Sequence, residues 1–231
     1  MYGLEKGIGL TNNQLKIIAM LSMLIDHVGM LLFPSVRVLR IIGRVAFPIF
    51  AFMIAEGCAH TRSRGKYLLK IVAMALLCQI VYAVAEGSVY QCVLVTFTLS
   101  ILIIFAVDRW MEAKTAASCA AMVAAITLAV FMTLVAPQLL KDTDYGVDYG
   151  FWGVLLPVAV YYIPGKHGKL LAVTLILTAL GMTVGGRQWY GLLAVPVLAL
   201  YNGCRGRLKL KYGFYIFYPV HLALLYLISM L

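Results

Sequence analysis

The apolar positions of this chain form long runs, separated by short polar segments, from near Leu15 to the carboxyl terminus. A helix needs roughly 20 mostly apolar residues to cross a bilayer, and shorter cores are tolerated when flanking residues reach the interface. The sixth to eighth runs are short, which leaves open the helix count and a re-entrant segment among them. We predict about nine spanning helices, at Leu15–Phe33, Val38–Gly57, Tyr67–Val84, Tyr90–Val107, Ala116–Ala136, Tyr149–Ile163, Leu170–Val184, Trp189–Tyr201 and Tyr212–Leu231.

The composition agrees with this pattern. Hydrophobic residues make up 63% of the 231 residues and charged residues only 12%, whereas a soluble domain carries roughly 25% charged residues. Membrane lipid is therefore the expected surrounding of the chain. No long linker, repeat or low-complexity stretch divides the sequence. We predict an all-α fold, a polytopic transmembrane helix bundle that forms a single integral membrane domain over residues 1–231.

The formal net charge is +10, and most of the basic residues lie in the loops between the apolar runs. Lys and Arg accumulate in short cytoplasmic loops of membrane proteins, so their distribution predicts a cytoplasmic amino terminus. Such charges, set between apolar runs, are not typical of a nucleic-acid surface, and the five cysteines lack the spacing of a metal site. One set of alternate loops holds Lys6, Lys16, Arg62, Arg64, Lys66, Lys70, Arg109, Lys114, Lys166, Lys169, Arg205, Arg207, Lys209 and Lys211, and the other holds Arg37, Lys141 and Arg187.

Ionisable residues inside the predicted spans are the main candidates for function, because a charge near the bilayer centre costs about 3 kcal/mol on insertion scales. The first span carries Asp26 and His27, and Lys16 precedes His27 by roughly 16 Å along an ideal helix. Lys16 could hold an anionic cofactor, while His27 could exchange protons near neutral pH. The alternative is structural: Lys16 anchors the helix end and the other two residues form a polar packing pair.

The second span places Arg40 and Arg44 four residues apart, on one face of a helix. Their guanidinium groups could neutralise Asp26 and position a phosphate, a carboxylate or an oxyanion; a purely structural salt bridge to Asp26 is the alternative. Pro48 is expected to kink this helix and to make room for a cavity. Glu56, near the other end of the helix, is a weaker candidate.

Three further segments carry candidate binding residues. Arg62 and Arg64 lie in a compact basic segment that could clamp a phosphorylated cofactor or serve orientation and lipid headgroups equally well. A predicted outer loop rich in acids, aromatics and glycine contains Asp144, Asp148 and Tyr149, which could line the entrance for an acceptor or form an interfacial belt. In the last span, Tyr218 shares a face with His221, which is expected to approach His27 or to be a satisfied core histidine.

Several of these segments resemble the TraX family of membrane proteins, named for a conjugation-system protein that acetylates the amino terminus of pilin. The resemblance rests on Asn13-Gln-Leu-Lys, Leu24-Ile-Asp-His-Val-Gly, Arg40-Ile-Ile-Gly-Arg-Val-Ala-Phe-Pro, Glu56-Gly, residues 61–68 and Asp144-Tyr-Gly through Gly153. A looser similarity extends to the wider membrane acyltransferases, which carry a basic residue, ten residues and then a histidine in the first helix. The spacing of Lys16 and His27 fits that pattern. This chain departs from those larger families in its smaller number of spans.

The resemblance implies a membrane acyltransferase in the bacterial inner or plasma membrane that uses acyl-CoA, most simply acetyl-CoA, and no metal. His27 would then be catalytic with Asp26 tuning it, and Lys16, Arg62 and Arg64 would hold coenzyme phosphates. The acceptor is an unknown amine or hydroxyl: a protein amino terminus, a sugar or a lipid-linked group. Two other classes fit the sequence: a small transporter with a proton or anion path through the polar residues, and a non-catalytic membrane assembly factor.

Overall fold

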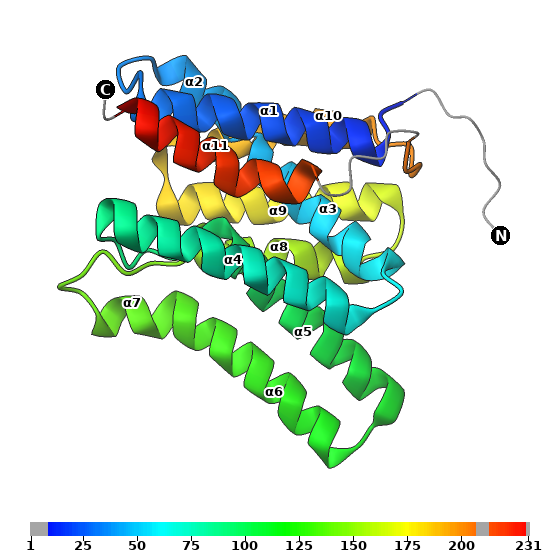
Figure 1. The fold of residues 1–231 in the computed structure, drawn as a ribbon. Helices are drawn as coiled ribbons and strands as arrows, with labels where there is room; N and C mark the ends of the chain where they lie inside the picture. Colours follow the sequence, from blue (N-terminus) through cyan, green and yellow to red (C-terminus); the bar gives the residue numbers. More distant parts are fainter. Residues whose placement is uncertain (1–8, 207–212, 230–231) are drawn as a thin grey trace.

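The computed structural model describes residues 9–206 and 213–229, and it is an all-α bundle of helices that run roughly side by side (Figure 1). No β-strand occurs in these residues, apart from two isolated bridges. The order of elements is α1 (Asn12–Leu31), α2 (Arg37–Gly43), α3 (Ala46–His60), α4 (Arg64–Glu86), α5 (Val93–Ala113), α6 (Ala116–Val130), the π-helical turn η1 (Phe131–Val135), α7 (Ala136–Leu139), α8 (Gly150–Tyr162), α9 (Lys166–Val184), the 3-10 helix η2 (Gly186–Leu193), α10 (Ala194–Ala199) and α11 (Gly213–Ser229).

Six helical segments of the described chain are long and apolar enough to cross a membrane. They are Asn12–Leu31, Arg37–His60, Arg64–Val84, Val93–Ala113, Ala116–Leu139 and Lys166–Val184, and two shorter apolar helices cover Gly150–Tyr162 and Phe217–Ser229. The predicted fold class, a polytopic helical membrane bundle, is confirmed. Residues 212, 230 and 231 of the last predicted span lie outside the described residues.

Helix α3 forms the centre of the bundle, because it is apolar all round and packs against α1, α5 and α8. Its Ile49 and Ala51 are fully buried, as expected for a helix without a polar face. By contrast, α4 and α6 expose most of their surface, with apolar side chains such as Leu69 and Val123 directed away from the bundle. In a membrane protein these outer faces meet lipid.

Two predicted spans are divided in the structure. The second, predicted as one helix, is broken at Arg44 and Val45 into α2 and α3. Pro48 has no N–H to donate to the carbonyl of Arg44 four residues earlier, which explains a break at that point. The eighth predicted span, Trp189–Tyr201, forms η2 followed by α10 of only 6 residues. That segment is too short to cross a bilayer as a helix, and Trp189 folds back onto Gly181 of α9.

The loops that were predicted to be basic gather at one end of the bundle, as far as the structure describes them; Lys6, Arg207, Lys209 and Lys211 lie outside the described residues. In Figure 1 the start of α1 and the connections α3–α4, α5–α6 and α8–α9 lie at the right-hand end, as does the described part of the segment after α10, whereas the connections α1–α2, α4–α5, α7–α8 and α9–η2 lie at the left. We call these the basic end and the opposite end. Thr11 caps α1 at the basic end by accepting a hydrogen bond from the backbone N–H of Gln14, whose side chain in turn accepts from the backbone N–H of Thr11. This capping box fixes where α1 begins.

Candidate active site

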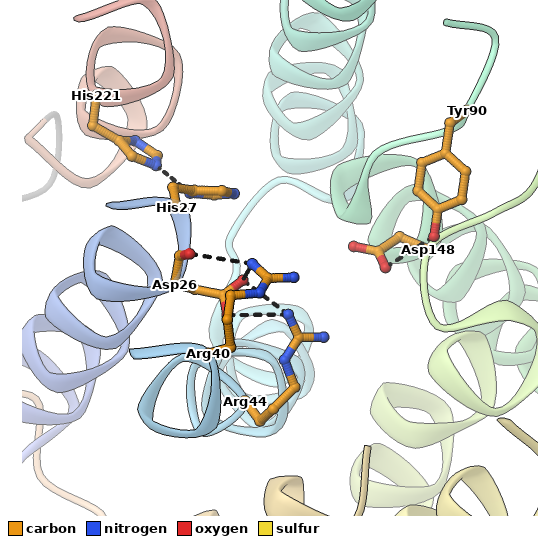
Figure 2. Close-up of polar contacts among 7 residues, drawn as sticks. All are labelled: Asp26, His27, Arg40, Arg44, Tyr90, Asp148 and His221. Atoms are coloured by element: carbon orange, nitrogen blue, oxygen red, sulfur yellow. Dashed lines mark hydrogen bonds and ion pairs between the residues drawn. The ribbon is translucent and has the colours of Figure 1, made fainter. Parts of the chain in front are cut away.

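The centre of the site is the carboxylate of Asp26, which lies between two arginines. Nη1 of Arg40 donates to Asp26 Oδ2 at 2.7 Å, and Nη2 of Arg44 donates to both carboxylate oxygens at 2.8 and 3.1 Å (Figure 2). All three side chains are at most 15% exposed. The prediction that both guanidinium groups reach Asp26 is confirmed. Two cations against one anion leave one excess positive charge in a poorly hydrated place.

This cluster depends on a close approach of α1 and α2. A Cβ atom at Gly43 would lie 2.1 to 2.4 Å from the Asp26 side chain, and one at Gly29 would lie 2.6 Å from Cβ of Leu39. Such distances are closer than packed atoms tolerate, so the two glycines allow the helices to touch. The ion cluster therefore depends on these two glycines as well as on its charged residues.

His27, the next residue along α1, turns away from this ion cluster and contacts α11. Its Nδ1 lies 2.8 Å from Nε2 of His221, and Nδ1 of His221 lies 2.8 Å from the carbonyl oxygen of Phe217. Both imidazoles are buried, with 9% and 5% exposure. The ring of Phe217 stacks on His221 at 4.7 Å between centroids. The predicted approach of the two histidines is confirmed.

These contacts fix the tautomers of both rings. A carbonyl oxygen can only accept, so Nδ1 of His221 carries the proton, and Nε2 of this neutral imidazole must accept. Nδ1 of His27 is then the donor between the rings. Nε2 of His27 then holds a lone pair, has no hydrogen-bond partner among the described residues, and is the ring nitrogen directed away from His221 in Figure 2. A neutral histidine with a free Nε2 is the form that accepts a proton.

A cavity of about 750 Å³ connects these groups. We call it the His27 cavity, since His27, Asp26, Arg40 and Arg44 form one wall of it. Arg44 contributes a further donor, because its buried Nε–H has no hydrogen-bond partner within the described residues. An unpaired buried donor is costly, which favours the presence of an acceptor atom when the site is occupied.

The opposite wall comes from the loop before α8, as predicted for Asp148 and Tyr149. Tyr90 donates through its hydroxyl to Asp148 at 3.2 Å, and burial raises the pKa of that carboxyl to about 6. Tyr149 has a left-handed backbone with a φ of 61° and stacks on Phe47 at 3.6 Å between ring centroids. A non-glycine residue in this region is strained, so packing against Phe47 holds the loop in place.

Asp144 also lines the His27 cavity, where it fastens two loops together. Its carboxylate accepts from the Ser88 hydroxyl and from the backbone N–H of Val89, and these two bonds lower the pKa of the carboxyl. The loop after α4 is further joined to the loop before α8 by backbone bonds from Gln91 to Gly146 and from Asp148 to Gln91. In the described chain, Asp144 therefore holds the loop before α8 against the loop after α4, and its two hydrogen bonds use part of what its carboxylate can accept.

The structure does not bring the remaining predicted binding residues to His27. Lys16 lines a different cavity. Arg62 is exposed and lines neither cavity, and Arg64 pairs with Asp108 and Glu112 at 3.2 and 2.9 Å. Glu56 accepts from Lys169 at 3.0 Å and from Tyr201 at 3.3 Å, a packing role between α3, α9 and the segment after α10.

The comparison with known protein families agrees with this picture. The family model described as TraX protein matches residues 11–229, which include every residue of the His27 cavity named above. The chain belongs to the TraX family. A probable fimbrial assembly protein FimC, serogroup H1, of Dichelobacter nodosus is 26% identical, over 96% of this chain and 97% of that protein. The uncharacterized protein RP591 of Rickettsia prowazekii (strain Madrid E) is 50% identical over 44 residues, 18% of each chain. No solved structure matches.

Several residues of this TraX-family site were missed from the sequence. Arg187 and Gln188 of η2 line the His27 cavity, as do Tyr82 and Tyr90. Arg187 could have been predicted as a site residue, because it is one of few basic residues in the loops of the opposite end. The two tyrosines could not, since aromatic residues near helix ends are also typical of an interfacial belt.

Proposed function

We propose that this TraX-family chain is a membrane-embedded acyltransferase, with several spans in a cell membrane and its amino terminus in the cytoplasm. It would transfer an acyl group, most simply acetyl from acetyl-CoA, to an amine or a hydroxyl. The observation that carries the proposal is the Nε2 atom of His27, which has no hydrogen-bond partner among the described residues and lies in a cavity beside two arginines. The similarity to a probable fimbrial assembly protein of Dichelobacter nodosus favours an acceptor in fimbrial assembly.

In the proposed reaction, the amine or hydroxyl of the acceptor gives its proton to Nε2 of His27 while its nitrogen or oxygen attacks the thioester carbonyl carbon. The carbonyl oxygen becomes an oxyanion, which the guanidinium of Arg44 or Arg40 stabilises. The carbon–sulfur bond then breaks, and the departing thiolate takes the proton from His27. General base catalysis of this kind contributes about 10² to 10⁴ in rate, and charge stabilisation by one donor contributes a similar factor.

Asp26 has a supporting part in this proposal. Its carboxylate bonds both arginines rather than His27, so it does not complete a Ser-His-Asp type of arrangement in the described chain. It holds the guanidinium groups in one orientation and offsets one of their two charges. Such pre-positioned donors do not have to reorganise when the oxyanion forms.

The test uses purified protein in detergent with acetyl-CoA and two acceptors, a short peptide with a free amino terminus and a methyl glycoside with free hydroxyls. Release of free thiol and mass spectrometry of the acceptor report transfer. His27→Ala should lower the rate by at least roughly 10² while leaving expression and elution volume unchanged. Transfer at the wild-type rate by this variant would reject the role of His27.

The fimbrial name of the relative also fits a non-catalytic assembly factor. The two functions differ in one cheap measurement, because an assembly factor has no need for acetyl-CoA. Absence of acetyl-CoA binding and of thiol release in the wild-type protein, together with normal assembly after His27→Ala in cells, would favour the assembly factor.

A further inference from the structure

The two arginines that hold Asp26 use only some of their donors in that contact. Arg40 donates to Asp26 through Nη1, and Arg44 donates through Nη2. Nη2 of Arg40 and Nη1 of Arg44 have no hydrogen-bond partner among the described residues, and both are open to the His27 cavity, whereas Nε of Arg44 is covered. In Figure 2 these two nitrogens point away from Asp26, toward the side of the cavity where Asp148 lies. Two guanidinium groups therefore present unused donors to one space.

Arg187 adds a third cation to the same cavity. It lies in η2, is exposed, and has no hydrogen-bond or ion-pair partner among the described residues. Helix η2 lies close to the arginine pair, since a Cβ atom at Gly191 would be 3.8 Å from the backbone oxygen of Arg44. Three arginines against the one carboxylate of Asp26 leave two excess positive charges on this side of the cavity. The oxyanion of the proposed reaction would offset one of them, and one remains.

The carboxylates of the other wall are held apart from these cations. Asp148 accepts from the hydroxyl of Tyr90 and lies across the cavity from both guanidinium groups (Figure 2). Asp144 is bonded to Ser88 in the loop after α4. A cavity with unused cationic donors on one side and carboxylates on the other suits a molecule that has an anionic group at one place and a hydrogen-bond donor, such as an amine or a hydroxyl, at another.

Toward the basic end, the His27 cavity stops at an apolar layer. A second cavity of about 200 Å³ lies beyond this layer. The side chains that line both cavities are Met23, Phe50, Val93, Phe97 and Tyr218. A charged group would lose its hydration in passing them. At the other end, the lining residues belong to η2 and to the polar loops after α4 and before α8, so an anion has its easier access there.

From these observations we propose that the acceptor carries a carboxylate or a phosphate group, which binds to Arg187 and to the unused donors of Arg40 and Arg44. The molecule would enter from the opposite end and present its amine or hydroxyl to His27. This inference rests on the proposed acyl transfer and narrows its acceptor to an anionic compound. A guanidinium group matches carboxylate and phosphate alike, so the experiment has one arm for each.

The two acceptors of the transfer assay, each paired with an anionic counterpart, test this inference. One pair is a tripeptide amide with either glutamine or glutamate at its second position, and the other is methyl glucoside and its phosphate monoester. For the wild-type protein, kcat/KM should be at least roughly tenfold higher for the anionic member of one pair, as expected of a charge-assisted contact. The pair that shows this preference identifies the anionic group. Equal values within both pairs would overturn the proposal.

Variants of Arg187 test the assigned contact. Arg187→Gln should reduce the preference to less than about threefold, and Arg187→Lys, which keeps the positive charge, should retain more of it. Arg37→Gln is the matched control, because Arg37 is an exposed arginine at the same end that does not line the His27 cavity. An equal reduction in Arg37→Gln and Arg187→Gln would indicate unspecific attraction to positive charge and would overturn the assignment.

Binding without an acyl donor separates failure of this inference from failure of the proposed function. The anionic acceptor should raise the melting temperature of the wild-type protein in detergent more than its neutral counterpart does, and Arg187→Gln should lose this difference. That result without any acyl transfer would keep the anion site and reject the enzyme. Transfer that depends on His27, with no preference within either pair, would keep the enzyme and reject this inference. Stabilisation by coenzyme A but not by the anionic acceptors would assign these cations to the donor and overturn the proposal.

Discussion

At the scale of single residues, the behaviour of His27 is set by a neighbour that is 194 positions away in the chain. Nε2 of His221 accepts a hydrogen bond from Nδ1–H of His27, because the proton of His221 is on its own Nδ1, where it is donated to the carbonyl oxygen of Phe217. The orientation of a base by a second group is a recurring device of enzyme sites. Here the second group is neutral, so no carboxylate is needed next to His27.

This leads to a prediction for His221. His221→Gln offers a carbonyl oxygen that can accept from His27 Nδ1, so transfer should fall by less than about tenfold. His221→Phe offers no acceptor, and the rate should fall by roughly 10 to 100-fold, the usual cost of losing an orienting partner. The comparison of kcat, KM and the pH profile of the two variants checks it. The opposite order, with His221→Phe near the wild-type rate and His221→Gln strongly impaired, would show that ring packing matters and the acceptor does not.

Asp148 carries the second prediction. Burial raises its pKa to about 6, above the value of an exposed aspartate, so the folded protein holds this proton more tightly than the unfolded chain does. This group therefore contributes stability at low pH that is lost as the pH rises through about 6.

Asp148→Asn, which cannot ionise, lacks that dependence. The melting temperature of wild type minus that of the variant, measured in detergent, should increase as the pH is lowered from about 7 to about 5. A difference that stays constant or shrinks over this range would contradict the shifted pKa.

At the scale of elements, the contact between α1 and α2 positions the arginines. Gly43→Ala would bring its Cβ within 2.1 Å of Asp26 unless the helices separate, so we expect a loss of about 1–3 kcal/mol in stability together with loss of transfer. Gly65→Ala is the control, since nothing lies within 4 Å of a Cβ there and alanine favours the helix. Thermal unfolding in detergent measures both. Equal stability of the two variants would show that α2 can move freely.

The elements were largely predictable, because runs of apolar residues long enough to cross a bilayer have few other structures available to them. The kink expected from Pro48 occurs as the break at Arg44 and Val45, because Pro48 cannot donate to the carbonyl of Arg44. What escaped prediction was the fold of the eighth run. The segment Trp189–Tyr201 has the apolar character of a membrane-spanning helix. Gly185 and Gly186, however, have positive φ values of 73° and 57°, and the chain turns back there.

The site was predictable only in part. Asp26, Arg40 and Arg44 could be grouped because they are close in sequence and because an unpaired charge in lipid has a high free energy. Arg62 and Arg64 were proposed as a basic segment that could clamp a cofactor, and their distance from His27 follows from the length of α3, which carries them to the basic end. Lys16 belongs to a different cavity for a related reason: it lies three turns of α1 before His27.

At the scale of the whole molecule, the bundle places its two cavities one after the other between the basic end and the opposite end. The α6–α7 segment packs mainly on α5 and α8 and takes no part in either cavity. Both cavities therefore lie in the part of the bundle built by α1 to α5, α11, η2 and the loop before α8, and the α6–α7 segment broadens the outer surface of the bundle.

The thin layer shared by the two cavities has a further consequence for a cell that lives on its membrane potential. If the cavities span the bilayer in sequence, then Met23, Phe50, Val93, Phe97 and Tyr218 are the electrical insulation at this point. Removing that bulk, for example with Phe50→Gly and Met23→Gly together, should allow protons to leak and dissipate the potential in energised vesicles. In the proposed function, a substrate would have to reach His27 without this layer ever being open to water on both faces.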